Sequence, residues 1–232
     1  WNATATPSTS KPAKTTMITA PVGLINIYEY VMTYKGASSS TGYLNNGLVW
    51  WILNPADVSN NYYIYTTGTI YTIASNIPTG IRPVINLKPG IKIVDGTGTE
   101  TDPYRLEGDN DTNISGTKLN TRYSGEYISF GTGENNLYRI VSHENSGLTK
   151  ITSAEPLKNN DSFVLSAFGT NSIYSSTNTI GSFLNNDYLN PSNGYLTSEQ
   201  VNMIEDYTTW YIGIVGWGTQ NYRGAKYKPD TS

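Results

Sequence analysis

Side chains that could catalyse a reaction or bind a metal are few in this sequence. His143 is the single histidine among 232 residues, and cysteine is absent. The absence of cysteine excludes disulfides, thiolate metal sites and cysteine nucleophiles, and one histidine cannot supply zinc-ligand spacing. Serines are frequent, but none lies in a G-x-S-x-G elbow, and only His143 could serve as their base. We interpret His143 as a turn residue between two strands.

Acidic residues offer a second kind of chemistry. Asp109 and Asp111 lie in a polar run, residues 109–113, whose oxygen-bearing side chains are of the type that Ca²⁺ accepts. Their spacing is not that of an EF-hand loop, so a solvated linker is the alternative. Glu205 and Asp206 are adjacent on a predicted helix and therefore cannot face each other as a glycosidase pair must. We predict no enzyme, no cofactor and no metal site, with Asp109 and Asp111 as the only calcium candidates.

Lysine and asparagine side chains could also join in an isopeptide bond, with Lys88 or Lys150 as the amine donor. The alternative, which the sequence favours, is that both lysines carry free amines.

Aromatic residues are the most informative group. Trp50 and Trp51 are adjacent, so in a strand they point to opposite faces, and we expect one in the core and one exposed. Exposed rings could stack on sugars or contact a protein, whereas packing inside the fold is the alternative. The ligand or interface candidates are Trp51, Tyr63, Tyr65, Trp217, Tyr222 and Tyr227.

Composition indicates an extracellular location. Charged residues make up 14% of the chain, and its polarity comes from Thr, Ser, Asn, Gly and 19 tyrosines. With 15 basic and 18 acidic residues, there is no positive surplus to neutralise a nucleic acid. No apolar run is long enough for a membrane span, and no signal peptide is recognisable at Trp1. We expect a secreted or surface-displayed protein whose export signal is absent from this chain.

The elements that would position these residues are mostly strands. Asn26 with Glu29, and Thr197 with Gln200, form capping boxes that predict helix starts. Pro83 places its strand at a sheet edge or bulge. Apolar spacing predicts helices over 26–36, 178–190 and 197–206, and strands over 22–25, 48–53, 62–65, 69–73, 81–87, 91–93, 103–106, 127–130, 137–142, 148–152 and 210–215. The fold class is therefore α+β, rich in strands, with about three short helices and long loops.

The segment Gly80-Ile81-Arg82-Pro83-Val84-Ile85-Asn86-Leu87-Lys88, followed by Gly96-Thr97-Gly98-Thr99 and Asp102-Pro103-Tyr104, resembles the closing signature of an extracellular domain family of Gram-positive bacteria. Upstream, Val22-Gly23-Leu24-Ile25 and Trp50-Trp51-Ile52-Leu53-Asn54-Pro55 are similar to further segments of that family. The resemblance implies a C-type-lectin-like fold of the branch that contains formylglycine-generating enzymes. Those enzymes need cysteine, which this chain lacks. Some family members carry pilin-like N-termini, which implies roles in filaments or at the cell surface.

The halves of the family domain stand in reversed order. Residues 17–106 resemble its C-terminal half, whereas residues 123–232 resemble its N-terminal half through Leu137-Tyr138-Arg139-Ile140-Val141 and Ser182-Phe183-Leu184-Asn185. Residues 107–122 would be a linker joining the natural ends, and residues 1–16 a flexible or exchanged arm. Either both halves fold into one permuted unit, which we favour, or the chain is a segment of a tandem array that holds the end of one unit and the start of the next. In an array, the halves would complete neighbouring units in a fibre.

These observations predict a structural subunit of an extracellular bacterial filament, whose partners are copies of itself or neighbouring surface subunits. The alternative is an adhesin or lectin-like module that binds a host glycan or protein through loop aromatics.

Overall fold

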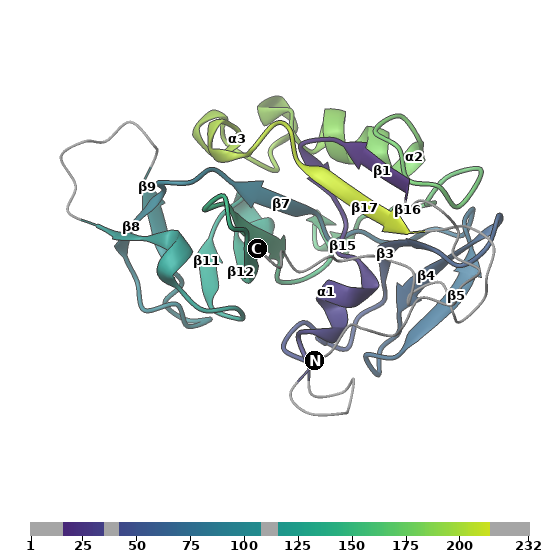
Figure 1. Cartoon of the computed structure of the whole chain (residues 1–232), viewed down its shortest axis with the longest axis horizontal. Helices are drawn as coiled ribbons and strands as arrows, with labels where there is room; N and C mark the ends of the chain where they lie inside the picture. Colours follow the sequence, from purple (N-terminus) through teal and green to yellow (C-terminus); the bar gives the residue numbers. More distant parts are fainter. Residues whose placement is uncertain (1–15, 35–41, 108–115, 214–232) are drawn as a thin grey trace.

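A computed structural model describes residues 16–34, 42–107 and 116–213 of the chain. This part of the protein is rich in strands and contains three short α-helices, as the sequence predicts for an α+β protein. Figure 1 shows β8 and β9 at one end of the molecule, β4 and β5 at the opposite end, and α1 between them. No helix in the described ranges is long and apolar enough to cross a membrane.

The central sheet has the strand order β11-β12-β13-β7-β2. All its neighbouring strands run antiparallel, so cross-strand partners lie directly opposite one another. Val22 pairs with Ile85, and Ile85 pairs with Ile151, which places these three side chains on one face. The strands are β2 (Val22–Gly23), β7 (Val84–Leu87), β11 (Tyr127–Ser129), β12 (Leu137–His143) and β13 (Thr149–Ser153).

The lateral sheet has the order β16-β6-β3-β4-β5, so β5 is one of its edges. Its middle strand, β3, is the apolar run that includes both adjacent tryptophans, and every residue of β3 is buried. The strands are β3 (Trp50–Pro55), β4 (Asn60–Ile64), β5 (Ile70–Ala74), β6 (Thr79–Gly80) and β16 (Leu165–Ser166).

Three small sheets complete the β-structure. One joins β1 (Thr16–Thr19) to β17 (Thr209–Gly213), one has the order β10-β8-β9, and one pairs β14 (Lys158–Asn159) with β15 (Ser162–Phe163). The sheet with the order β10-β8-β9 consists of β8 (Lys92–Asp95), β9 (Arg105–Glu107) and β10 (Thr117–Lys118).

Segments on both sides of residues 107–122 build the same sheets. In the central sheet, β2 and β7 precede that segment and β11 to β13 follow it, while β1 pairs with β17 across nearly the whole described chain. The segment itself takes part in the fold at its ends. Glu107 closes β9, Thr117–Lys118 forms β10, and Leu119 is buried. Its described residues are therefore not a plain linker.

The helices begin where the capping boxes predict. Asn26 accepts a hydrogen bond from the Glu29 amide at 2.9 Å, and the Glu29 carboxylate accepts one from the Asn26 amide at 3.1 Å. Thr197 and Gln200 form the same reciprocal pair at the start of the third helix. The helices are α1 (Ile27–Val31), α2 (Thr179–Ser182) and α3 (Ser198–Met203), and α2 continues into a π-helical turn, η4 (Phe183–Asp187). Short 3₁₀ turns are η2 (Leu119–Thr121), η3 (Gly133–Asn135) and η5 (Pro191–Asn193).

Helix α1 is shorter than the predicted range 26–36. Its last turn tightens because the amides of Thr33 and Tyr34 bond to carbonyls three residues earlier, and the Thr33 hydroxyl also donates to the Tyr30 carbonyl. Gly36, the predicted C-cap, lies outside the described residues.

The prediction that Pro83 places its strand at an edge or bulge is wrong. Strand β7 starts after the proline and lies between β13 and β2 in the central sheet. Because Pro83 precedes the strand, its missing amide hydrogen costs the ladder nothing. Its carbonyl is used as an acceptor by the Thr152 hydroxyl at 3.0 Å.

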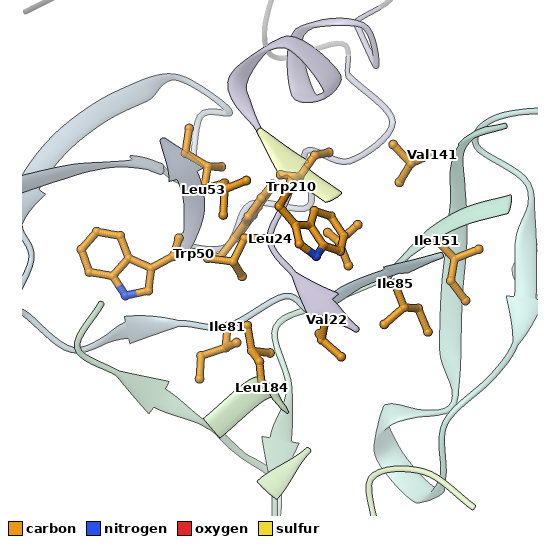
Figure 2. Close-up of a cluster of buried hydrophobic side chains, with 14 of the residues drawn as sticks. Val22, Leu24, Trp50, Leu53, Ile81, Ile85, Val141, Ile151, Leu184 and Trp210 are labelled. Carbon is orange, nitrogen blue, oxygen red and sulfur yellow. The ribbon is translucent and has the colours of Figure 1, made fainter. Parts of the chain in front are cut away.

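The core is one contiguous cluster that unites both sheets. Figure 2 shows part of it, in which Trp50 and Leu53 of the lateral sheet lie beside Leu24 and Trp210, with Val22, Ile85 and Ile151 of the central sheet further on. Tyr138 and Tyr188, which come from β12 and the end of η4, are fully buried and their hydroxyls bond to each other at 2.5 Å. Buried hydroxyls remain tolerable here because they satisfy one another.

Candidate binding surface

The β4–β5 hairpin carries most of the described aromatic candidates. Gly68, with a φ of 80°, supplies the left-handed residue of the connecting turn, and its amide donates to the Tyr65 carbonyl at 2.8 Å. The Tyr30 hydroxyl of α1 donates to the Gly68 carbonyl at 2.8 Å, which fixes the tip of the hairpin to the body of the protein. The hairpin's two strands correspond to those that the sequence predicts over 62–65 and 69–73.

Three tyrosines of this hairpin form a cluster. Tyr63 on β4 lies directly opposite Tyr71 on β5, and Tyr65 follows Tyr63 by two residues, so all three rings share one face. The ring centres are 6.4 Å apart for Tyr63 and Tyr71, 5.8 Å for Tyr65 and Tyr71, and 6.5 Å for Tyr63 and Tyr65. We call Tyr63, Tyr65 and Tyr71 the tyrosine cluster.

The cluster is open to solvent at its outer side. Tyr65 is 43% exposed and Tyr71 is 51% exposed, whereas Tyr63 is half-buried between them. Burial, together with the two neighbouring tyrosines, raises the pKa of Tyr63. At neutral pH the Tyr63 hydroxyl therefore stays protonated. Tyrosine rings can stack on a ligand, and their hydroxyls can exchange hydrogen bonds with it.

Trp51 lies beside the cluster, on the same face of the sheet, and is fully buried, so its prediction as a ligand or interface residue is wrong. It pairs with Tyr63 across β3 and β4, and the two ring centres are 6.5 Å apart. Phe168 covers its other side at 5.6 Å, and the indole nitrogen donates to the Ser166 carbonyl at 2.8 Å. Trp50 is buried on the opposite face of β3, so neither of the adjacent tryptophans is exposed.

Tyr71 is a surface residue that the sequence prediction missed. The signal for it is the cross-strand register of a hairpin centred on Thr67, which places Tyr71 opposite Tyr63. Strand alternation alone places Tyr71 and Ile73 on the same face of β5, and it does not say whether that face is covered.

The remaining aromatic and calcium candidates cannot be placed. Trp217, Tyr222 and Tyr227 lie outside the described residues, as do Asp109 and Asp111. Within residues 16–34, 42–107 and 116–213, no group of three or more metal-ligating side chains comes together.

Both ring nitrogens of His143 have hydrogen-bond partners within the fold. Its Nε2 is 2.7 Å from the Arg122 carbonyl, and its Nδ1 is 3.0 Å from the Thr149 hydroxyl. Since a carbonyl only accepts, Nε2 carries the proton and Nδ1 accepts from the threonine. Both ring nitrogens are thus used to join the end of β12 to its neighbours, and neither is directed at a serine nucleophile.

A shallow polar pocket of about 140 Å³ lies away from the tyrosine cluster, near η3 and η5. Glu134, Lys158 and Tyr195 are among its lining residues. The Glu134 carboxylate accepts the Asp161 amide at 3.1 Å, and the Lys158 ammonium is paired with Glu155 at 2.7 Å. Both charges are occupied by local partners, so this pocket is a less suitable ligand site than the tyrosine cluster.

Comparison of the chain with family models, with curated proteins and with solved structures finds no match in any of the three. The class that the structure defines is a β-rich α+β protein with an open aromatic cluster at a sheet edge.

Proposed function

We propose that the protein is a non-enzymatic extracellular binding module and that the tyrosine cluster is its ligand surface. The observation that carries the proposal is the packing of Tyr65 and Tyr71, whose rings meet at 82° while about half of each side chain remains exposed. A turn fixed by Tyr30 and a buried Trp51 hold the rings in place, so a ligand meets a pre-organised surface.

The chemistry around the cluster favours a neutral carbohydrate. Residues 60–81, which include β4, β5 and their turn, contain no Lys, Arg, Asp or Glu. Flat faces of pyranose rings stack on aromatic side chains, and the nearby hydroxyls of Thr67 and Thr69 provide polar partners. A charged ligand would find no counter-charge in this hairpin. The proposed ligand is therefore an uncharged glycan of a cell surface.

We also propose that the fold is a C-type-lectin-like domain written with its halves in reversed order. Sheets shared by segments before and after residues 107–122 support this proposal, because a single chain then supplies both halves of one unit. The resemblance around Arg82 points in the same direction. An extracellular location accords with the absence of cysteine and with the low charge.

A glycan array with variants in the cluster tests the function. Tyr65→Ala and Tyr71→Ala should each weaken binding to neutral glycans by about tenfold, the effect of losing roughly 1.4 kcal/mol of stacking. Tyr123→Ala and Tyr207→Ala are matched controls, because these tyrosines are 73% and 80% exposed and lie outside the cluster. Equal losses in cluster and control variants, or no binding to any neutral glycan, would contradict the proposal. Binding only to unglycosylated proteins would show that the ligand is a protein and not a glycan.

A second candidate function is the filament subunit. The observation that favours it is that β5 has no further strand on its outer side within the described part of the chain, so an extended segment of a neighbouring copy could add one there. In this proposal the exchanged segment is residues 1–15, which make up most of the N-terminal arm that the sequence predicts over 1–16. Native mass measurement of the full chain should then show a ladder of oligomers that disappears when residues 1–15 are deleted. A strict monomer that binds glycans would exclude this function and leave the first.

A further inference from the structure

A buried lysine on β13 has surroundings that the binding function does not require. Lys150 is only 6% exposed, and its ammonium donates to the carboxylate of Glu29, which is equally buried. The carboxylate of Glu144 lies 3.2 Å away on the outer side. The Trp210 ring covers the ammonium, with its centre 5.5 Å away. Burying an ion pair in this way gives little net stability, because desolvation offsets the attraction.

Asn86 on β7 is the cross-strand partner of Lys150 and lies on the same face of the central sheet. Its side-chain nitrogen donates to the Thr208 hydroxyl at 3.3 Å. Its side-chain oxygen is buried and has no hydrogen-bond partner among the described residues. A buried amide oxygen left without a donor costs about 1–3 kcal/mol, so its retention calls for an explanation.

The surroundings of this amide are buried. Gly23 pairs with Val84 on the same face, and the Trp210 ring packs directly on Gly23. Figure 2 shows Trp210 on one side of the central sheet, while Val22, Ile85 and Ile151 extend from the other side. Opposed residues of an antiparallel pair have Cβ atoms roughly 4.5–5.5 Å apart, a gap that the four-carbon stem of a lysine spans when it folds towards its partner.

We propose that Lys150 and Asn86 form an intramolecular isopeptide bond, with Glu29 as the proton carrier. The lysine ammonium first transfers a proton to the Glu29 carboxylate. The neutral Nζ then attacks Cγ of Asn86, and the new C–N bond forms as the C–Nδ2 bond breaks. The departing nitrogen takes up the second proton of Nζ and leaves as ammonia, which then removes the proton from Glu29. One amide replaces another and no electrons are exchanged, so neither oxidant nor reductant is needed.

The first proton transfer is energetically unfavourable. Burial by itself lowers the pKa of Lys150, but the carboxylates of Glu29 and Glu144 outweigh this effect and raise it overall. The proton therefore rests on Lys150 until it moves along the hydrogen bond to Glu29. A Glu144→Gln variant should speed the reaction, because it removes one of the two charges that hold the proton on the lysine.

The bond would join β7 to β13, and hence the segments before and after residues 107–122. A covalent link between distant positions restricts the unfolded chain, as a disulfide does, and this chain has no cysteine to make one. Such a cross-link suits a surface protein that bears mechanical load, whether it binds a ligand or forms a filament.

Intact mass spectrometry of the purified full chain under denaturing conditions tests the proposal. The chain should be lighter than its sequence mass by about 17 Da, the loss of one ammonia. Protease digestion should yield a branched peptide that contains both Lys150 and Asn86. Wild-type protein that is folded and has its full sequence mass would overturn the proposal, and this outcome does not depend on any variant being stable.

Three variants separate this bond from other losses of ammonia. Lys150→Arg and Glu29→Gln should both have the full mass, whereas Lys88→Arg, the matched lysine control, should keep the loss. Lys88 lies near Asn86 in sequence but donates to the Asn202 carbonyl at 2.7 Å. A succinimide at an asparagine would also lower the mass by about 17 Da, but it would persist in Lys150→Arg. That persistence, or a digest without the branched peptide, would contradict the isopeptide bond.

Discussion

The guanidinium carbon of Arg82 lies 4.5 Å from the centre of the Trp50 ring, in the fully buried interior. Its Nε and Nη2 donate to the Ser153 carbonyl at 2.9 and 2.6 Å, and Nη1 donates to the Leu44 carbonyl at 2.8 Å. Burial lowers the pKa of Arg82 to about 9, so the side chain is still charged at neutral pH. One cation thus joins three segments that are distant in sequence.

Arg82→Lys should destabilise the protein by about 2–4 kcal/mol, because an ammonium cannot reproduce the planar fork or the stacking on Trp50. Urea unfolding followed by tryptophan fluorescence measures the change. Arg105→Lys is the matched control, since Arg105 is exposed and pairs with Asp95 at 2.6 Å at the surface, where such pairs contribute little. Similar midpoints for the two variants would show that the buried contacts of Arg82 are not important for stability.

Gly23→Ala should also destabilise the protein, by about 1–3 kcal/mol. A Cβ atom at Gly23 would lie 2.5 Å from Cδ2 of the Trp210 ring, which is far inside van der Waals contact. Combining it with Trp210→Phe replaces the clashing indole by a smaller ring, so the double variant should lose less than the sum of the two single losses. A double-mutant cycle in urea that gives strict additivity would contradict this packing.

Thr197→Ala should cost about 1 kcal/mol, because it removes the acceptor for the Gln200 amide at the start of α3. Thr197→Ser keeps the hydroxyl oxygen and should be close to wild type. Thermal unfolding of both variants compares them directly. A serine variant as unstable as the alanine variant would mean that the threonine methyl group, and not the cap, is what matters.

Stability should fall at alkaline pH because of the Tyr138–Tyr188 pair. Burial raises the pKa of both phenols above the usual 10.0. Well below pH 10, both phenols are protonated in the folded and the unfolded state, so this pair adds no pH dependence to stability there. Above pH 10, the unfolded state releases protons that the folded state retains, so the free energy of unfolding decreases as pH rises.

Tyr138→Phe removes one of these phenols and should reduce the alkaline slope by about 1.4 kcal/mol per pH unit. At neutral pH it should lose about 1–2 kcal/mol, because the Tyr188 hydroxyl loses its partner. Urea midpoints measured from pH 8 to pH 11.5 provide both quantities. An unchanged slope would show that Tyr138 ionises normally in the folded state.

Local pattern was sufficient for two helix starts and for several of the strands. The capping boxes at Asn26 and Thr197 begin α1 and α3, and the strands predicted over 62–65 and 69–73 pair as the β4–β5 hairpin. Such features depend on residues within one or two turns of one another, so they can be predicted without knowledge of the fold. The strand at Val84–Leu87 was predicted for the same reason, although its place in the sheet was not.

The sequence by itself determined that cysteine chemistry is excluded, that strands dominate, and that the β4–β5 hairpin is aromatic and uncharged. Only the tertiary structure decided that Trp51 is buried while Tyr71 is open, because exposure depends on which segment covers a face, and Phe168 is remote in sequence. The same holds for Lys150, whose carboxylate Glu29 and cross-strand partner Asn86 come from other parts of the chain. Long-range pairing brings them together, and the sequence contains no local signal for it.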